Sequence, residues 1–280
     1  MICARILCLL VLVPAVAAQT PRTVDKLRAD GYDALFNLDY DNARRSFQKL
    51  CDLEPDNPAG PESFALSLWL EQLNKTWQAK GKLYSDEADT KDQPKVNANQ
   101  VAEFRKWTRR TKQLAQARLR KDKRDVEALY FLGAAEGLEA AYAAGVERKY
   151  MSALRSGSDA VDQHRKVLEL SPQFIDAYLT IGLQDYVIGS LALPVKMMAG
   201  TFGVHGSKKR GLKELEQVSR DGHWARDVAR VLLVDLYKRE KRWDDAIATS
   251  RDLSTRYPRN VLFKQQLADA LAKKGAAAGK

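Results

Sequence analysis

Residues 226–258 read RDVARVLLVDLYKREKRWDDAIATSRDLSTRYP, and this stretch decides the fold of the chain. Apolar residues recur with helical spacing, stop at the polar KREKR segment (238–242), and then resume. The apolar positions are Val228, Val231, Leu232 and Leu236 before that segment and Ala246, Ile247 and Leu253 after it. The pattern predicts two amphipathic helices joined by a tight turn. Such a unit cannot bury its apolar face alone, so we expect further copies.

Alanines and prolines at a fixed interval mark these copies. In three places an alanine is followed twelve residues later by a proline: Ala43 and Pro55, Ala160 and Pro172, and Ala246 and Pro258. A proline ends a helix, because its nitrogen carries no hydrogen and its ring clashes with the preceding turn. The equal intervals therefore indicate that one helix pair is repeated along the chain.

The pattern resembles that of the tetratricopeptide repeat (TPR) family. The matching positions are Tyr40 and Trp243 at the turns, Leu132–Gly133 and Ile181–Gly182 in first helices, and the three alanines and three prolines above. The resemblance covers most of the chain after the first eighteen residues and implies an all-α solenoid of stacked helix pairs. The three prolines lie 117 and 86 residues apart, and neither is a multiple of the regular 34-residue repeat, so insertions must separate the units.

We expect about five TPR-like helix pairs in a solenoid over residues 19–274. In chain order they are 22–55, 58–121, 125–171, 174–222 and 226–258. The polar stretch 84–99 predicts an exposed loop inside the second pair. Residues 260–274 predict a capping helix, and residues 275–280 predict a disordered tail.

An apolar insertion at 193–207 interrupts the fourth pair. It contains Met197, Met198 and Phe202 in a segment that is too broken by proline and glycine to be a regular helix. Three interpretations stay open. The insertion folds back into the core, forms an adaptable methionine-rich contact surface, or touches a membrane.

The first eighteen residues predict a secretory signal peptide. Arg5 gives a positive start, residues 6–18 form an apolar run, and small residues precede Gln19. The run is 13 residues long, shorter than the roughly 20 that a helix needs to cross a bilayer. We therefore expect cleavage near Ala18 and an exported protein, periplasmic or secreted.

The sequence lacks the usual signatures of catalysis and of cofactor or metal binding. The histidines, His164, His205 and His223, have neither a cysteine partner nor the spacing of metal ligands on a helix. The chain has no Gly-x-Ser-x-Gly motif, and the glycine-rich run at 200–208 lacks the Gly-Lys-Ser/Thr order of a phosphate loop. We expect no enzyme activity and no cofactor. Export and the lack of a nucleic-acid-binding module also argue against nucleic acid as a partner.

The TPR resemblance implies a concave groove that holds an extended peptide or a partner's helix. The positions that would face this groove are Arg28, Tyr32, Tyr130, Leu183, Tyr186, Asp235 and Lys238. We therefore expect a scaffold that binds a protein partner in the cell envelope or the secreted space. Alternatively, these residues are ordinary packing residues and the partner binds the convex side.

Residues 105–124 form a basic stretch with ten Lys and Arg against one acidic residue, in a chain with a net charge of +10. The side chains that could contact an anion are Arg105, Lys106, Arg109, Arg110, Lys112 and Arg120. One interpretation is an ordinary solvated helix face. The other is a contact for an acidic protein, or a peripheral module that binds an anionic membrane surface, an anionic lipid or a glycolipid.

Overall fold

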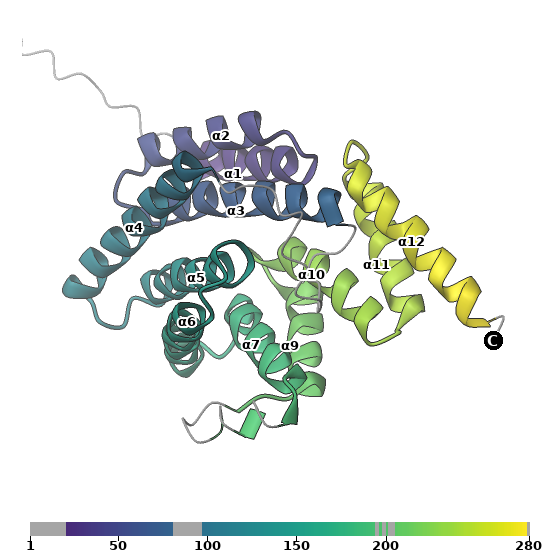
Figure 1. Ribbon diagram of the computed structural model, residues 1–280. Coiled ribbons are helices and arrows are strands. Elements are labelled where there is room, and N and C mark those ends of the chain that lie inside the picture. Colours follow the sequence, from purple (N-terminus) through teal and green to yellow (C-terminus); the bar gives the residue numbers. More distant parts are fainter. Residues whose placement is uncertain (1–20, 81–96, 194–195, 198–199, 201–204, 279–280) are drawn as a thin grey trace, which may run out of the picture.

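The computed structural model describes residues 21–80, 97–193, 196–197, 200 and 205–278, and every regular element in these ranges is helical (Figure 1). The helices are α1 (Pro21–Phe36), α2 (Tyr40–Leu53), α3 (Ala59–Lys80), α4 (Ala98–Lys121), α5 (Val126–Tyr142), α6 (Tyr150–Leu170), α7 (Tyr178–Ser190), α9 (Lys208–Asp221), α10 (Arg226–Arg239), α11 (Trp243–Arg256) and α12 (Val261–Ala278). A π-helical turn, η1 (Ala143–Glu147), follows α5, and a 3-10 turn, η2 (Ile175–Ala177), precedes α7. The predicted signal peptide at 1–18 lies outside the described residues.

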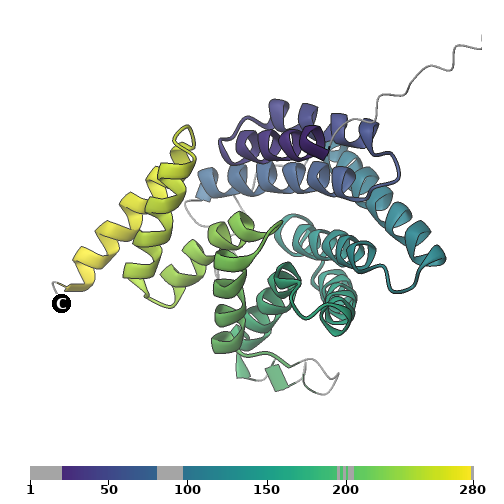
Figure 2. The same ribbon diagram turned by 180° about the vertical axis from the view of Figure 1, so that it is seen from behind.

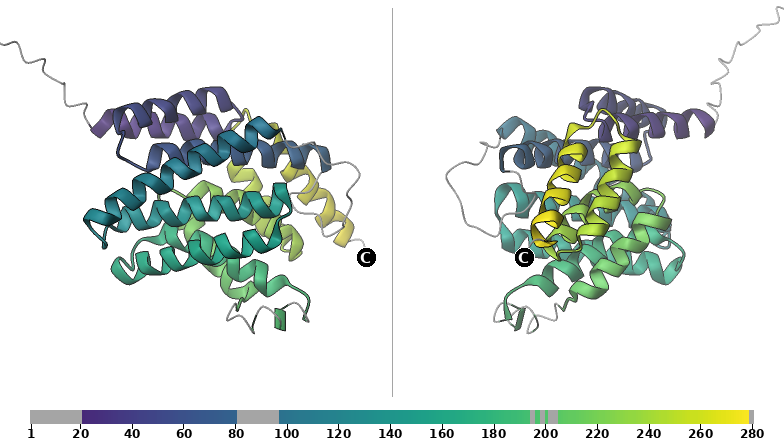
Figure 3. Two further views of the ribbon diagram at one scale, coloured as in Figure 1. Left: turned by 60° about the vertical axis from the view of Figure 1, so that its left-hand side comes forward. Right: turned by 90° about the vertical axis from the view of Figure 1, so that its right-hand side faces the viewer.

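Helices that are neighbours in sequence pack as pairs: α1 on α2, α3 on α4, α5 on α6, α7 on α9 and α10 on α11. The last helix, α12, packs on α11. In the left view of Figure 3 the first three pairs lie in successive layers. The prediction of an all-α solenoid with TPR-like helix pairs and a C-terminal capping helix is confirmed.

Three of the pairs share one turn geometry. A residue with left-handed backbone lies two positions before the first residue of the second helix: Leu38 (φ 66°) before Tyr40, Arg148 (φ 57°) before Tyr150, and Lys241 (φ 58°) before Trp243. This conformation costs about 1–2 kcal/mol for a residue with a side chain. Packing of the two helices offsets that cost at all three turns.

The three marker prolines end their helices in the same way. Pro55, Pro172 and Pro258 each lie two residues after the last residue of α2, α6 and α11. The intervening residues, Glu54, Ser171 and Tyr257, have φ between −122° and −147°, as expected for a residue before proline. The marker alanines Ala43, Ala160 and Ala246 are fully buried, where their small side chains let the helices approach.

Helices α1 and α2 approach each other closely at Gly31. A Cβ atom on this glycine would lie 2.5 Å from the ring of Phe47 on α2. Because that distance is far shorter than any real carbon–carbon contact, α1 and α2 can pack at this spacing only with glycine at position 31.

Some predicted boundaries differ from the structure. The disordered tail was predicted from residue 275, but α12 continues to Ala278, because three alanines of high helix propensity follow Gly275. The predicted loop 84–99 lies mostly outside the described residues, and its last two positions belong to α4, which Asn97 caps through its side chain. In the insertion, Leu193 and Met197 are 70% and 66% exposed, while Met198 and Phe202 are outside the described residues.

The solenoid curls until its last pair meets its first. The loop before α12 reaches the end of α1, as Figures 1 and 2 show from opposite sides. Asn260 donates from Nδ2 to the carbonyl of Phe36 at 2.7 Å, and the backbone N–H of Arg259 donates to Asn37 Oδ1 at 3.1 Å. The rings of Phe36 and Tyr257 lie 5.1 Å apart. We call these interactions the closing contact. Residues from both ends of the chain thus share one hydrophobic core.

Substituting Asn260 with alanine should destabilise the protein by about 2–4 kcal/mol, because it removes the cap of α12 and leaves the buried Phe36 carbonyl without its partner. Urea unfolding followed by circular dichroism measures the change. Asn57→Ala is the matched control. Asn57 lies two residues after Pro55, just as Asn260 lies two residues after Pro258, and it caps α3, but it makes no bond to the far end of the chain. We expect about 1 kcal/mol for that variant. Equal effects of the two substitutions would contradict the closing contact.

Candidate functional site

The inner side of the curled solenoid encloses a cavity of about 90 Å³. We call it the inner cavity. Its walls come from α1, α3, α5, α7 and α10, the first helices of all five pairs, with contributions from α6 and η2. The apolar and aromatic lining includes Leu66, Trp69, Leu138, Leu179, Leu183, Trp224, Val228 and Leu232. Because the first helices of a solenoid face its concave side, closure of the curl converts the open groove into this cavity.

A carboxyl group without a partner lines the inner cavity. Glu62, on the first turn of α3, is 8% exposed, and its carboxyl makes no hydrogen bond or ion pair with any residue that the structure describes. Burial raises the pKa of this carboxyl from 4.5 to about 8, so the group is mostly protonated at neutral pH. The neighbouring Ser63 instead shares a hydrogen bond of 3.1 Å with the Tyr32 hydroxyl.

Tyr130 and His164 also line the inner cavity. His164 Nε2 lies 3.0 Å from the backbone oxygen of Tyr130, and because a carbonyl oxygen only accepts, Nε2 carries the proton. The remaining nitrogen, Nδ1, is a buried acceptor that has no hydrogen-bond partner among the described residues. Burial lowers the pKa of His164 to about 4, so the ring is neutral. The rings of Tyr130 and His164 stack with their centres 5.2 Å apart.

An arginine and a tryptophan lie beside the cavity. The Arg28 guanidinium lies 4.1 Å over the ring of Trp224 and 3.5 Å from the Asp25 carboxylate, while its Nε is buried without a partner in the described part of the chain. Trp224 is held by Asp176, which accepts the backbone N–H groups of residues 223, 224 and 225 at 2.7–3.1 Å. Asp176 is therefore committed to the N-terminus of α10.

The structure brings together four of the seven residues predicted to face a groove. Tyr32, Tyr130 and Leu183 line the inner cavity, and Arg28 stacks on its wall residue Trp224. The other three are engaged in contacts within α10 or between α10 and its neighbours. The Tyr186 hydroxyl donates to Glu240 at 2.9 Å, and Lys238 forms ion pairs with Asp235 at 3.5 Å and Asp269 at 3.1 Å. Contact between any of these seven residues and a partner stays a prediction.

Sequence analysis missed Glu62 and the tryptophans of the inner cavity. A signal was present, because Glu62 opens the otherwise apolar run ESFALSLWL at 62–70. A charged residue at the start of a buried helix is normally explained by a cap or an ion pair, and Glu62 has neither in the described chain.

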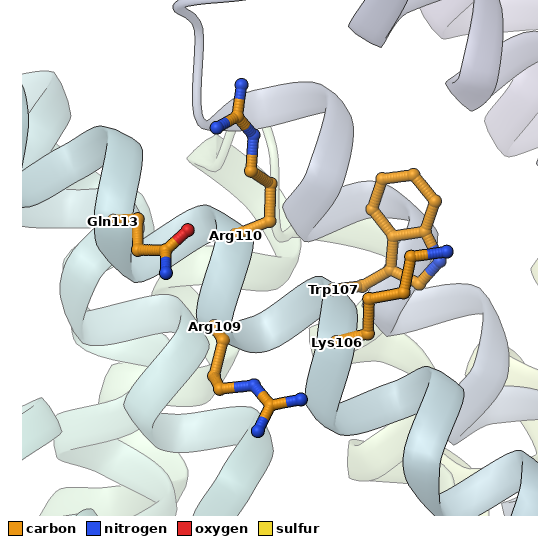
Figure 4. A pocket seen from close by; sticks show the side chains of 5 residues that line it. All are labelled: Lys106, Trp107, Arg109, Arg110 and Gln113. Atoms are coloured by element: carbon orange, nitrogen blue, oxygen red, sulfur yellow. The ribbon is translucent and has the colours of Figure 1, made fainter.

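The basic residues of α4 lie on the second helix of their pair, away from the inner cavity. Arg105, Lys106 and Lys112 form ion pairs with Glu147, Glu103 and Glu139, and Arg110 donates to the backbone oxygen of Pro55 at 3.2 Å. Arg109 and Arg120 are exposed and form no ion pair within the described residues. Lys106, Trp107, Arg109, Arg110 and Gln113 line a surface depression, in which Arg109 and Arg110 extend in opposite directions (Figure 4). The cations therefore do not converge on one point.

The described residues offer no sign of a membrane span or of a metal site. None of the helices there has both the length and the apolar content that crossing a bilayer requires. In the same ranges, no three His, Cys, Asp or Glu side chains gather closely enough to hold a metal ion.

Comparisons with known proteins find similarity among solved structures. No family model matches the chain. No curated protein matches it either. Among solved structures, a thermophilic TPR protein from Thermus thermophilus is similar, with 15% identity, a TM-score of 0.46, and coverage of 89% of this chain and 99% of that chain. The fold described above rests on the helix contacts of the present chain, and no function is transferred from that protein.

The carboxyl of Glu62 should make stability depend on pH. Its pKa is about 8 in the folded protein and about 4.5 when unfolded, so the unfolded chain loses this proton first. The free energy of unfolding should therefore decrease as pH rises from about 4.5 to about 8, by up to a few kcal/mol. Glu62→Gln should remove this contribution and be more stable than wild type at pH 8, as measured by urea unfolding.

Glu71→Gln is the control on the same helix, because Glu71 forms ion pairs with Arg44 and Lys75 that hold its pKa below the usual value. This variant should keep the pH dependence that Glu62 causes. If Glu62→Gln and wild type differ by the same amount at pH 5 and pH 8, Glu62 is not buried as described.

Proposed function

We propose that this protein is a non-catalytic scaffold that binds a protein partner on the concave side of its solenoid, at the inner cavity. The observation that carries the proposal is that the first helices of all five pairs converge on one cavity. Tyr32, Leu179, Leu183 and Trp224 are only half-buried, so they offer apolar contact area at its edge. Hot spots of binding interfaces are aromatic residues around well-packed pockets of this kind.

The size of the cavity defines how a partner would engage. About 90 Å³ accommodates part of one side chain and is far too small for a helix. A partner segment would therefore lie across the half-buried rim and insert a single anchoring side chain. This mode replaces the wide groove that the TPR resemblance implies.

The polar groups of the cavity support a binding role over catalysis. A nucleophile needs a base within hydrogen-bond reach. The hydroxyl of Tyr32 is shared with Ser63, and burial raises its pKa above the usual range. The protonated nitrogen of His164 is committed to a carbonyl. We assign no catalytic residue.

We further propose that the scaffold works outside the cytoplasm after removal of residues 1–18. Arg5, the apolar run at 6–18 and the small residues before Gln19 support this proposal. Expression in a bacterial host followed by osmotic-shock fractionation and intact mass analysis should give an exported chain that begins at Gln19. Replacing Leu10 and Leu12 with arginine should keep the uncleaved chain inside, because it destroys the apolar run. A cytoplasmic chain that retains Met1 would contradict export.

The basic face of α4 supports a second candidate, a peripheral module that binds an anionic lipid or glycolipid surface. Arg109 and Arg120 are exposed, and no described carboxylate neutralises them. A membrane surface needs no converging pocket, since polybasic segments bind it through their summed charge, at roughly 1 kcal/mol for each residue near the surface.

Photo-crosslinking in the native cell separates the two candidates. A photoreactive phenylalanine analogue replaces Leu183 at the inner cavity, Arg109 on α4, or the exposed Asp162 on α6 as a control. We expect a discrete protein adduct at Leu183, identified by mass spectrometry, and none at the other two positions. Adducts formed at Arg109 but not at Leu183 would overturn the concave-side proposal in favour of the α4 face.

A further inference from the structure

We infer that the inner cavity binds a primary ammonium group through the Glu62 carboxylate. The group could be the end of a lysine side chain or a free small alkylamine. The inference deepens the proposed function by naming the chemistry of the anchoring group. It depends on the proposed function only if the ammonium group belongs to a lysine of a protein partner.

The cavity offers acceptors without a matching cation. Glu62 lines it with a carboxyl that has no partner in the described chain, and it is nine-tenths buried. Tyr130 adds a hydroxyl for which the described chain supplies no partner, while His164 lines the cavity with a neutral ring whose Nδ1 has no surface open to it. A primary ammonium carries three N–H donors and a positive charge, so it can serve a carboxylate and further acceptors at once.

The charged and titratable groups around Glu62 leave it available. Asp176, on η2, is committed to the backbone of α10. Arg28, on α1, is held by Trp224 and Asp25 and forms no ion pair with Glu62. Tyr32 and Tyr130 have pKa values raised by burial and by the Glu62 charge, and burial keeps His164 neutral. A bound cation would therefore be the main partner of the carboxylate.

The walls and the volume fit a small cation on an alkyl stem. Trp69, Trp224, Tyr32 and Tyr130 all line the cavity, and aromatic rings attract cations, more strongly where water is excluded. About 90 Å³ equals roughly three water volumes, which suits an ammonium with two or three methylene groups. A quaternary ammonium is bulkier and has no N–H donor, so it fits less well.

Binding should be coupled to proton release. In the empty cavity Glu62 is mostly protonated at pH 7, because burial raises its pKa to about 8. An ammonium favours the carboxylate, so as the ion pair forms the Glu62 O–H bond breaks and its proton passes to water, while the ammonium keeps its three N–H bonds. Affinity should therefore increase about tenfold per pH unit from pH 6 to pH 7 and level off above pH 8.

The test is an NMR titration of the tryptophan indole signals of the full chain with n-butylammonium chloride. Butan-1-ol, sodium butyrate and tetramethylammonium chloride are the comparators. We expect selective binding of n-butylammonium with the stated pH dependence.

Glu62→Gln should weaken n-butylammonium binding at least tenfold, while Glu71→Gln on the same helix should leave that binding unchanged. Tyr130→Phe, which removes one hydroxyl and keeps the ring, should weaken it and tests the site if Glu62→Gln fails to fold.

Equal binding of butan-1-ol, or unchanged binding by Glu62→Gln, would overturn the ammonium site. A peptide with one central lysine, compared with its acetylated form, identifies the source of the amine. Tighter binding of the unmodified peptide than of n-butylammonium assigns the site to a partner's lysine, and the reverse assigns it to a free amine. Failure of every amine together with protein adducts at Leu183 would overturn this inference and leave the scaffold proposal standing. Amine binding without any protein adduct at Leu183 would support the ammonium site and overturn the scaffold proposal.

Discussion

The hydrogen bond between Asn260 and the carbonyl of Phe36 joins residues 224 positions apart, and the inner cavity depends on the closure that it secures. An open solenoid presents its first helices as a concave surface in contact with water. Here the last pair returns to the first, so these helices face one another across a small volume. Burial of Glu62 in the cavity wall follows from that closure rather than from the local sequence, whereas His164 is buried within its own pair, against Gly133 and Tyr130 of α5.

Closure also explains the unusual electrostatics of the interior. A carboxyl on a solvated groove would titrate normally and be fully hydrated, whereas Glu62 is 8% exposed and has gained no partner in the described chain. Such a group reduces stability, and a residue of this kind in a lined cavity is more often found at a functional site than in a structural core. The polar atoms of Asp176, by contrast, are fully used to cap α10, so the two acids of the cavity have different roles.

Local sequence rules predict much of the fold because they act over a few residues. The twelve-residue interval between alanine and proline predicts where α2, α6 and α11 pack and end. Closure could not be predicted, since a few degrees of rotation at each repeat decide whether a solenoid stays open or meets itself. For the same reason, only some of the residues predicted to face a groove line the inner cavity. Tyr32 and Tyr130 line the cavity, whereas Tyr186 and Lys238 hold neighbouring helices together.

A distance measurement across the closing contact tests this account most directly. Asp33 on α1 and Arg259 before α12 are exposed and lie 3.5 Å apart as an ion pair. Spin labels at these two positions, in a chain whose native cysteines Cys3, Cys8 and Cys51 are replaced by alanine, can be compared by pulsed electron paramagnetic resonance in solution. Closure predicts one narrow distribution at short distance that does not depend on salt, because buried packing and hydrogen bonds maintain it. A broad distribution extending to long distances would mean that the solenoid is open and that the inner cavity does not exist in solution.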